Sequence, residues 1–155
     1  MSRASIYHAL SELLAGSPPW AVNSARAWSL YADAERVAHN SPAARRAILS
    51  MSDIPAESAE QRRARYDALF LNPPRRWLYE SAAKTGRILG EETFAVAKIY
   101  RAAGLVASLG AEPPDHASLE LAFLAHLAEN AGAHPEHADE WRALERQFIQ
   151  EHGGW

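Results

Sequence analysis

The proline pair Pro113-Pro114 constrains the fold more than any other feature of this chain. Pro114 has no backbone N–H to donate and holds Pro113 in extended geometry, so a helix cannot pass through the pair. Asp115 follows directly and suits a helix N-cap, because its carboxyl group can accept from the first free N–H groups of a helix. The sequence therefore predicts a helix that begins at about Asp115 and runs to about Asn130.

This helix carries ionisable groups on its apolar side. At about 100° per residue, His116 and Glu120 fall in the middle of the apolar arc, one turn apart. Burying them costs free energy unless each finds a partner. Two interpretations stay open: a satisfied His–Glu pair at the helix end, or a binding groove whose polar groups await a ligand. The arc consists of Leu119, Leu121, Phe123, Leu124, Leu127 and Ala128.

Most of the remaining chain also repeats its apolar residues at helical spacing. Residues 75–81 follow two prolines and are expected as a loop or a short turn. We find no strand pattern and no repeat, which predicts an all-α fold: one globular bundle of about six to eight helices over residues 1–155, with Pro113-Pro114 as a hinge loop between its halves. The other helices are expected near Ile6 to Leu14, over Ala21 to His39, from Pro42 to Met51, from Ser58 to about Phe70 with a Ser58–Gln61 capping box, from Glu91 to Tyr100 with Gly104 after its end, and through Trp141, Leu144 and Phe148 after a break at residues 132–137.

Composition restricts the class of protein. With 155 residues, 48% hydrophobic and 23% charged, the chain suits one soluble globular domain. The absence of cysteine excludes disulfides and thiolate chemistry. A net charge of −3 argues against nucleic acid as the main partner and favours a basic peptide. The chain has neither a signal core nor a run of 18 apolar residues, so we expect a cytoplasmic protein that does not insert into a membrane.

The common catalytic motifs are missing from the sequence. It contains no G-x-x-x-x-G-K-[ST], no G-x-S-x-G and no H-E-x-x-H. His134 and His137 in one loop, or His116 with Glu120, supply too few ligands for a selective metal site. We therefore expect no enzymatic activity, no metal and no cofactor.

Two blocks of residues carry a resemblance to a known family. The run E-P-P-D-H-x-x-L-E-L-x-F-L, from Glu112 to Leu124, resembles the signature of the TorD/DmsD/NarJ family, the cytoplasmic chaperones that mature molybdenum-containing reductases. The second block lies upstream, in matching order and spacing, at Tyr66, Leu69-Phe70, Pro73 and Tyr79-Glu80-Ser81. The resemblance implies a TorD-like helical fold. It also implies a client, namely the twin-arginine signal peptide or the apo form of a molybdenum-cofactor oxidoreductase.

In that family the P-D-H loop is implicated in peptide binding, which here points to Pro114, Asp115 and His116. Carboxylates suit a peptide arginine, because the planar guanidinium group can donate two parallel hydrogen bonds to one carboxylate. Aromatic residues in a loop often line a recognition surface. On these grounds Asp115→Ala is expected to weaken peptide binding and leave the fold intact. The predicted peptide-binding residues are Glu112, Pro114, Asp115, His116, Leu119, Glu120, Phe123, Trp77 and Tyr79.

The sequence also leaves a second class of function open, a helical adaptor that binds a folded partner without recognising a signal peptide. Family members are usually longer than this chain, so C-terminal helices are expected to be truncated, absent or supplied by a second copy. Helix exchange in a homodimer would cover the apolar surface so exposed. The shared motifs do not identify the client reductase.

Overall fold

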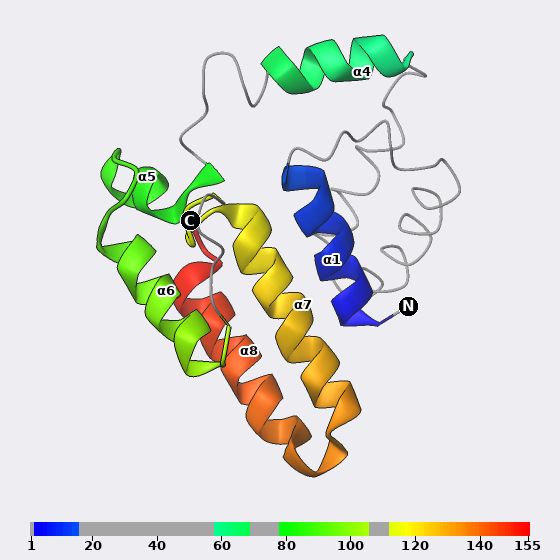
Figure 1. Ribbon diagram of the computed structural model, residues 1–155, viewed down its shortest axis with the longest axis vertical. Helices are drawn as coiled ribbons and strands as arrows, with labels where there is room; N and C mark the ends of the chain where they lie inside the picture. Colours follow the sequence, from blue (N-terminus) through cyan, green and yellow to red (C-terminus); the bar gives the residue numbers. More distant parts are fainter. Residues whose placement is uncertain (1, 16–57, 69–77, 106–111) are drawn as a thin grey trace. The chain divides into compact units, whose positions relative to one another are not determined.

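The computed structural model describes residues 2–15, 58–68, 78–105 and 112–155, and these ranges are helical (Figure 1). No strand forms within them; Tyr79 and His116 make an isolated antiparallel bridge. The all-α prediction is confirmed. The elements are α1 (Arg3–Leu14), α4 (Ala59–Tyr66), α5 (Glu80–Thr85), α6 (Glu91–Ala102), α7 (Ala117–Ala133), the 3-10 helix η4 (Pro135–His137) and α8 (Ala138–His152).

The chain divides into two compact units, one of residues 1 and 16–73 and the other of residues 2–15 and 74–155. In the first unit the described residues form α4. The predicted capping box is present there: Ser58 Oγ accepts from Gln61 N at 3.2 Å, and Gln61 Oε1 accepts from Ser58 N at 2.9 Å. The helices predicted over residues 21–39 and 42–51 lie outside the described residues, as do Leu69, Phe70 and Trp77. A single domain over the whole chain, with a hinge at Pro113-Pro114, stays a prediction.

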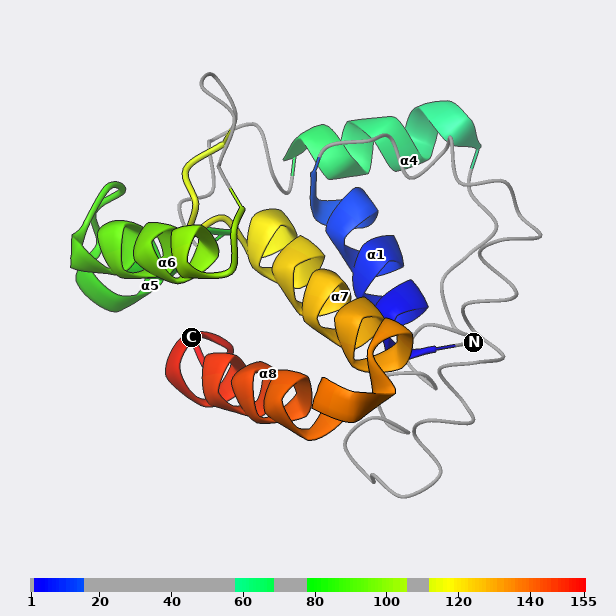
Figure 2. The same cartoon turned by 60° about the horizontal axis from the view of Figure 1, so that its bottom comes forward.

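In the second unit α7 packs against both α1 and α8 (Figures 1 and 2). Helix α1 contacts them through polar as well as apolar groups. Its Ser11 Oγ donates to the backbone oxygen of Ser118 on α7 at 2.7 Å. Tyr7 donates to the buried Glu145 of α8 at 3.0 Å, and Arg3 forms an ion pair with the same carboxyl group at 3.1 Å. These contacts tie the first helix of the chain to the last described one.

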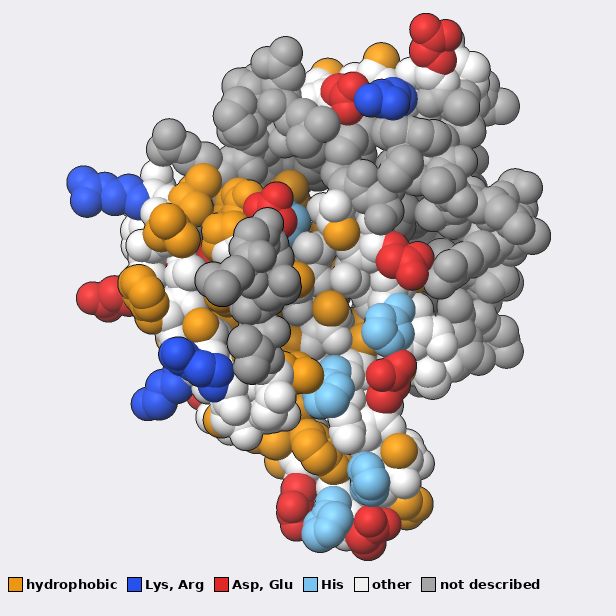
Figure 3. Space-filling model, in the orientation of Figure 1, with side chains coloured by type: hydrophobic (Ala, Val, Ile, Leu, Met, Phe, Trp, Pro, Cys, Tyr) orange, Lys and Arg blue, Asp and Glu red, His pale blue; other side chains and the backbone are white. Residues whose placement is uncertain are grey.

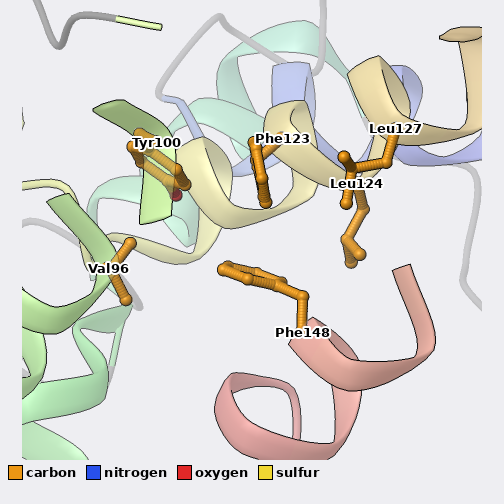
Figure 4. Packing of buried hydrophobic residues seen from close by; sticks show 6 residues of the cluster. All are labelled: Val96, Tyr100, Phe123, Leu124, Leu127 and Phe148. Atoms are coloured by element: carbon orange, nitrogen blue, oxygen red, sulfur yellow. The ribbon is translucent and has the colours of Figure 1, made fainter. Parts of the chain in front are cut away.

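Aromatic residues from three helices fill the core of this unit (Figure 4). The ring centroids of Tyr100 (α6) and Phe123 (α7) lie 4.8 Å apart, and those of Phe123 and Phe148 (α8) are also 4.8 Å apart. Burying an aromatic side chain of this size contributes about 1.5–3 kcal/mol. The cluster, completed by Val96, Leu124 and Leu127, therefore fixes α6, α7 and α8 together.

Helix α6 agrees with its prediction, whereas α5 replaces part of a predicted loop. Glu91 and Glu92 occupy the first turn of α6, and Gly104 follows its end with a φ of 78°, a left-handed conformation that glycine adopts freely. Residues 75–81 were expected as a loop or short turn, but a helix begins at Glu80. The side chain of its own N-cap, Tyr79, makes no capping bond. The capping group comes from a distant part of the chain.

Candidate functional site

Asp115 caps α5, not the helix that follows it in sequence. Its Oδ2 accepts from Ser81 N at 2.9 Å, and its backbone oxygen accepts from Glu80 N at 2.9 Å. Asp115 is completely buried, and in the part of the chain that the structure describes its Oδ1 has no hydrogen-bond partner. The prediction that Asp115 is the N-cap of α7 is therefore wrong. Its carboxyl group accepts from one free N–H at the start of α5 and its backbone oxygen accepts from another.

His116 takes the capping role at α7, which begins at Ala117. Its Nδ1 accepts from Ser118 N at 3.3 Å and lies 2.7 Å from Ser118 Oγ. Burial lowers the pKa of His116, which favours the neutral ring that can accept a hydrogen bond. The ring also meets the edge of Tyr79 at 4.9 Å between centroids. His116 is 5% exposed, so its side chain supports the site from beneath and has almost no surface that a ligand could contact.

The His116–Glu120 pair considered in the sequence does not form, because each side chain has another partner. Glu120 Oε2 accepts from Trp155 Nε1 at 3.1 Å, and its Oε1 is buried with no partner within the described ranges. Burial, with repulsion from Glu80 as the second cause, raises the pKa of Glu120 to about 8. A carboxyl group in this state is protonated at neutral pH and ionises when a cation approaches.

Glu80, like Asp115, has no exposed surface. One carboxyl oxygen bonds to Lys84 Nζ, and the other lies 2.8 Å from Nδ1 of His152 at the end of α8. Glu80, Asp115 and Glu120 form what we call the acidic cluster; Glu80 and Asp115 both act electrostatically on Glu120. The cluster thus joins α5, the P-P-D-H turn, α7 and the end of α8.

An apolar pocket of about 310 Å³ opens between α6, α7 and α8. Its walls are largely hydrophobic, although Gln147 and Glu151 contribute polar groups. Phe148 lines the pocket and also lies 5.0 Å, between ring centroids, from His152, the partner of Glu80. The pocket and the acidic cluster are therefore neighbours. The other lining residues are Ile99, Ala102, Ala103, Phe123, Trp141 and Leu144.

The predicted site residues fall into two groups. Asp115, His116, Glu120 and Phe123 are buried and meet around the start of α7. Glu112 is exposed, Pro114, Leu119 and Tyr79 are half-buried, and the Tyr79 hydroxyl donates to Glu112 Oε2 at 2.6 Å. The tyrosine O–H has a raised pKa because of its partial burial and this bond. Trp77 lies outside the described residues. Whether these residues touch a peptide stays a prediction.

Sequence reasoning missed the partners that complete the site. Glu80 lies in the upstream block that carries the family resemblance, but it was not predicted as a site residue, and neither were Lys84 and His152. The fold brings Glu80 and Lys84 to Glu120, and His152 to Glu80. Leu144 was predicted only as part of the last helix; it is 46% exposed and lines the pocket. Its apolar character on a surface position was the available signal. On the face of the molecule that Figure 1 shows, hydrophobic side chains reach the surface among charged ones (Figure 3).

In the described ranges, no three histidine, aspartate or glutamate side chains gather closely enough to hold a metal ion. The loop histidines His134 and His137 approach Glu136 and Glu140 at 3.5 and 3.4 Å as exposed pairs. Among the same residues, no helix has the length and apolar character needed to cross a bilayer.

An all-helical domain that carries the P-P-D-H turn (residues 113–116) is consistent with the TorD-like fold of the molybdoenzyme maturation chaperones. The family model described as "Nitrate reductase delta subunit" matches residues 32–154, and the chain belongs to this family. The family matures molybdenum enzymes and is not a family of catalysts. No curated protein and no solved structure shows a significant match to the chain.

Proposed function

We propose that this protein is a cytoplasmic chaperone that binds the twin-arginine signal peptide, and the apo form, of a molybdenum-cofactor oxidoreductase. Binding would assist maturation and delay export until the client has folded. The observation that carries the proposal is the adjacency of the apolar pocket and the acidic cluster in a member of this family. A signal peptide that presents arginines followed by an apolar segment has the complementary order of groups.

The two parts of the site make unequal contributions to affinity. An exposed carboxylate that faces a peptide arginine contributes about 0.2–1 kcal/mol. Burying on the order of 500 Å² of apolar surface contributes roughly 12 kcal/mol before the costs of association, and micromolar binding needs about 8 kcal/mol. The pocket therefore supplies most of the affinity. The acids set the register and the preference for arginine.

Burial divides the predicted residues by role. Glu112, Tyr79 and Leu119 have exposed surface and are proposed to meet the peptide directly, together with Leu144 and Glu151 of the pocket. Asp115, His116 and Phe123 hold the wall on which the peptide lies. Their substitution is expected to act through the shape of the site.

The test is calorimetric titration of the protein with synthetic twin-arginine signal peptides, each paired with a twin-lysine control. Saturable binding near micromolar, weakened by lysine, is expected. Leu144→Glu places a charge in the pocket and should weaken binding about tenfold or more. Leu10→Glu is the matched control, because Leu10 of α1 is exposed to a similar degree, 43% against 46%, and lies outside the pocket.

Equal binding by both glutamate variants would remove the pocket from the proposal. Absence of binding to every peptide, with a folded protein, would favour the alternative function, an adaptor that recognises a folded partner. A homodimer by helix exchange remains a separate prediction, and sedimentation equilibrium of the same sample tests it.

A further inference from the structure

Segment 152–155, which begins at the last residue of α8, places two ring N–H groups on the acidic cluster. His152 Nδ1 lies 2.8 Å from Glu80 Oε2, and Trp155 Nε1 donates to Glu120 Oε2 at 3.1 Å. The two acceptors belong to different helices, α5 and α7. A short segment thus supplies, from within the chain, two planar N–H donors to two buried carboxyl groups.

The cluster still has capacity to accept hydrogen bonds. Glu120 Oε1 and Asp115 Oδ1 are both buried and have no hydrogen-bond partner among the described residues; the two residues are 5% and 0% exposed. A buried polar atom that is left unpaired costs free energy. A ligand that brought more donors than the segment does would therefore gain free energy by replacing it. A guanidinium has five N–H donors in one plane, whereas an ammonium has three that point apart.

The segment is built so that it can leave without unfolding the helix before it. Gly153 and Gly154 separate His152 from Trp155 and give the backbone more freedom than any other pair of residues would. Gly153 ends α8 with its N–H bonded to Ile149 O at 2.9 Å, where a Cβ would come within 2.8 Å of that oxygen. Beyond it, Gly154 has open space around its Cα. The tryptophan contact can break while α8 stays intact.

We propose that segment 152–155 is an internal strap that occupies a guanidinium-binding seat at Glu120 and Asp115, and that an arginine of the client peptide displaces Trp155 from it. The inference rests on the proposed function and adds that the client arginine and Trp155 compete for the same carboxyl group. The strap protects the buried carboxyl groups in the absence of a client. It also makes the site selective, because an ammonium does not replace the planar donors that leave.

The test compares wild type with Trp155→Phe, which keeps an aromatic ring and removes the N–H donor. Fluorescence anisotropy measures the affinity of each for a labelled twin-arginine peptide and its twin-lysine counterpart. Removing the competing bond should tighten arginine-peptide binding about three- to tenfold and leave lysine-peptide binding unchanged. Gln150→Ala is the matched control, since Gln150 lies on the exposed side of the same helix end, and it should bind as wild type does.

Glu120→Gln, made alone and in combination with Trp155→Phe, tests the seat itself. Glu120→Gln keeps an acceptor for Trp155 but cannot ionise when an arginine approaches, so it should abolish the preference for arginine and the gain from Trp155→Phe. If wild type binds the twin-arginine peptide and Trp155→Phe binds it equally well or more weakly, the strap is refuted and the proposed function is not. Binding by Trp155→Phe, when wild type does not bind, would support the strap most strongly. Failure of both proteins to bind would refute the seat and the proposed function together.

Discussion

Asp115 shows how one side chain joins two parts of the fold. It stands at the turn before α7, yet its carboxyl oxygen and its backbone oxygen both accept from the first residues of α5, 34 and 35 positions earlier in the chain. Together with the Tyr79–His116 bridge, these bonds hold the start of α5 against the start of α7. Because none of its surface is exposed, Asp115 can affect a ligand only by positioning the starts of α5 and α7.

Asp115→Ala is therefore expected to destabilise the protein. The substitution leaves Ser81 N–H buried without its acceptor, which should lower the free energy of unfolding by about 1–3 kcal/mol. Asp115→Asn keeps an oxygen for Ser81 and should cost less. Urea unfolding monitored by far-UV circular dichroism measures both differences. An alanine variant as stable as wild type, but with weakened peptide binding, would support the sequence-based expectation instead.

The sequence could show that Asp115 is a capping residue but could not show which helix it caps. Capping preferences are local: a carboxyl group before an apolar run favours the following helix. The choice between α7 and α5 depends on which N–H groups the fold brings closest, and Ser81 lies 34 residues away. The same limit applies to Glu120, whose two expected partners in sequence were His116 or a ligand. Its observed partner, Trp155, is 35 residues further along the chain.

At the scale of elements, prediction succeeded where local signals were complete. The Ser58–Gln61 capping box and the acidic start and glycine end of α6 were all read correctly. Helix α5 was missed because its own N-cap, Tyr79, contributes no side-chain bond. The apolar pocket was missed for a similar reason. Periodicity identifies the hydrophobic side of α8, but only the packing of α6 and α7 decides which of those residues stays uncovered.

Helix α7 depends on a histidine cap, which is an uncommon choice. His116→Ala removes the acceptor for Ser118 N–H and the aromatic contact with Tyr79, so we expect a loss of about 1–2 kcal/mol in the free energy of unfolding. His116→Asn supplies a better capping oxygen and should recover roughly half of this loss. Chemical denaturation of the three proteins at pH 7 provides the comparison. If asparagine is no more stable than alanine, the cap contributes little and the Tyr79 contact accounts for the loss.

At the scale of the whole molecule, one buried acid gives global stability a distinct dependence on pH. Glu120 has a pKa of about 8 in the folded state, against a reference value of 4.5. Between these two values the native state holds a proton that the unfolded chain has released. Stability therefore falls as pH rises through this window and levels off above about pH 8. The slope approaches about 1.4 kcal/mol per pH unit for one such group.

The groups that face Glu120 are Glu80 and Lys84 of α5, Tyr100 of α6, Asp115 in the turn, and Trp155. His116 titrates with the opposite sign. Burial lowers its folded pKa, so its contribution to stability is lost as pH falls below about 6.5. Measurement on wild type alone would mix the two effects. A variant that removes one titrating group and preserves its shape separates them.

We expect wild type to lose about 2–3 kcal/mol of unfolding free energy, relative to Glu120→Gln, between pH 5.5 and pH 7.5. Glutamine keeps the acceptor for Trp155 and cannot ionise, and both proteins share the contribution of His116. Urea unfolding followed by tryptophan fluorescence at four pH values gives the difference at each. Parallel curves would show that Glu120 is already ionised in the folded protein. The carboxylate would then lie ready for a cation without releasing a proton, and peptide affinity would be independent of pH in this range.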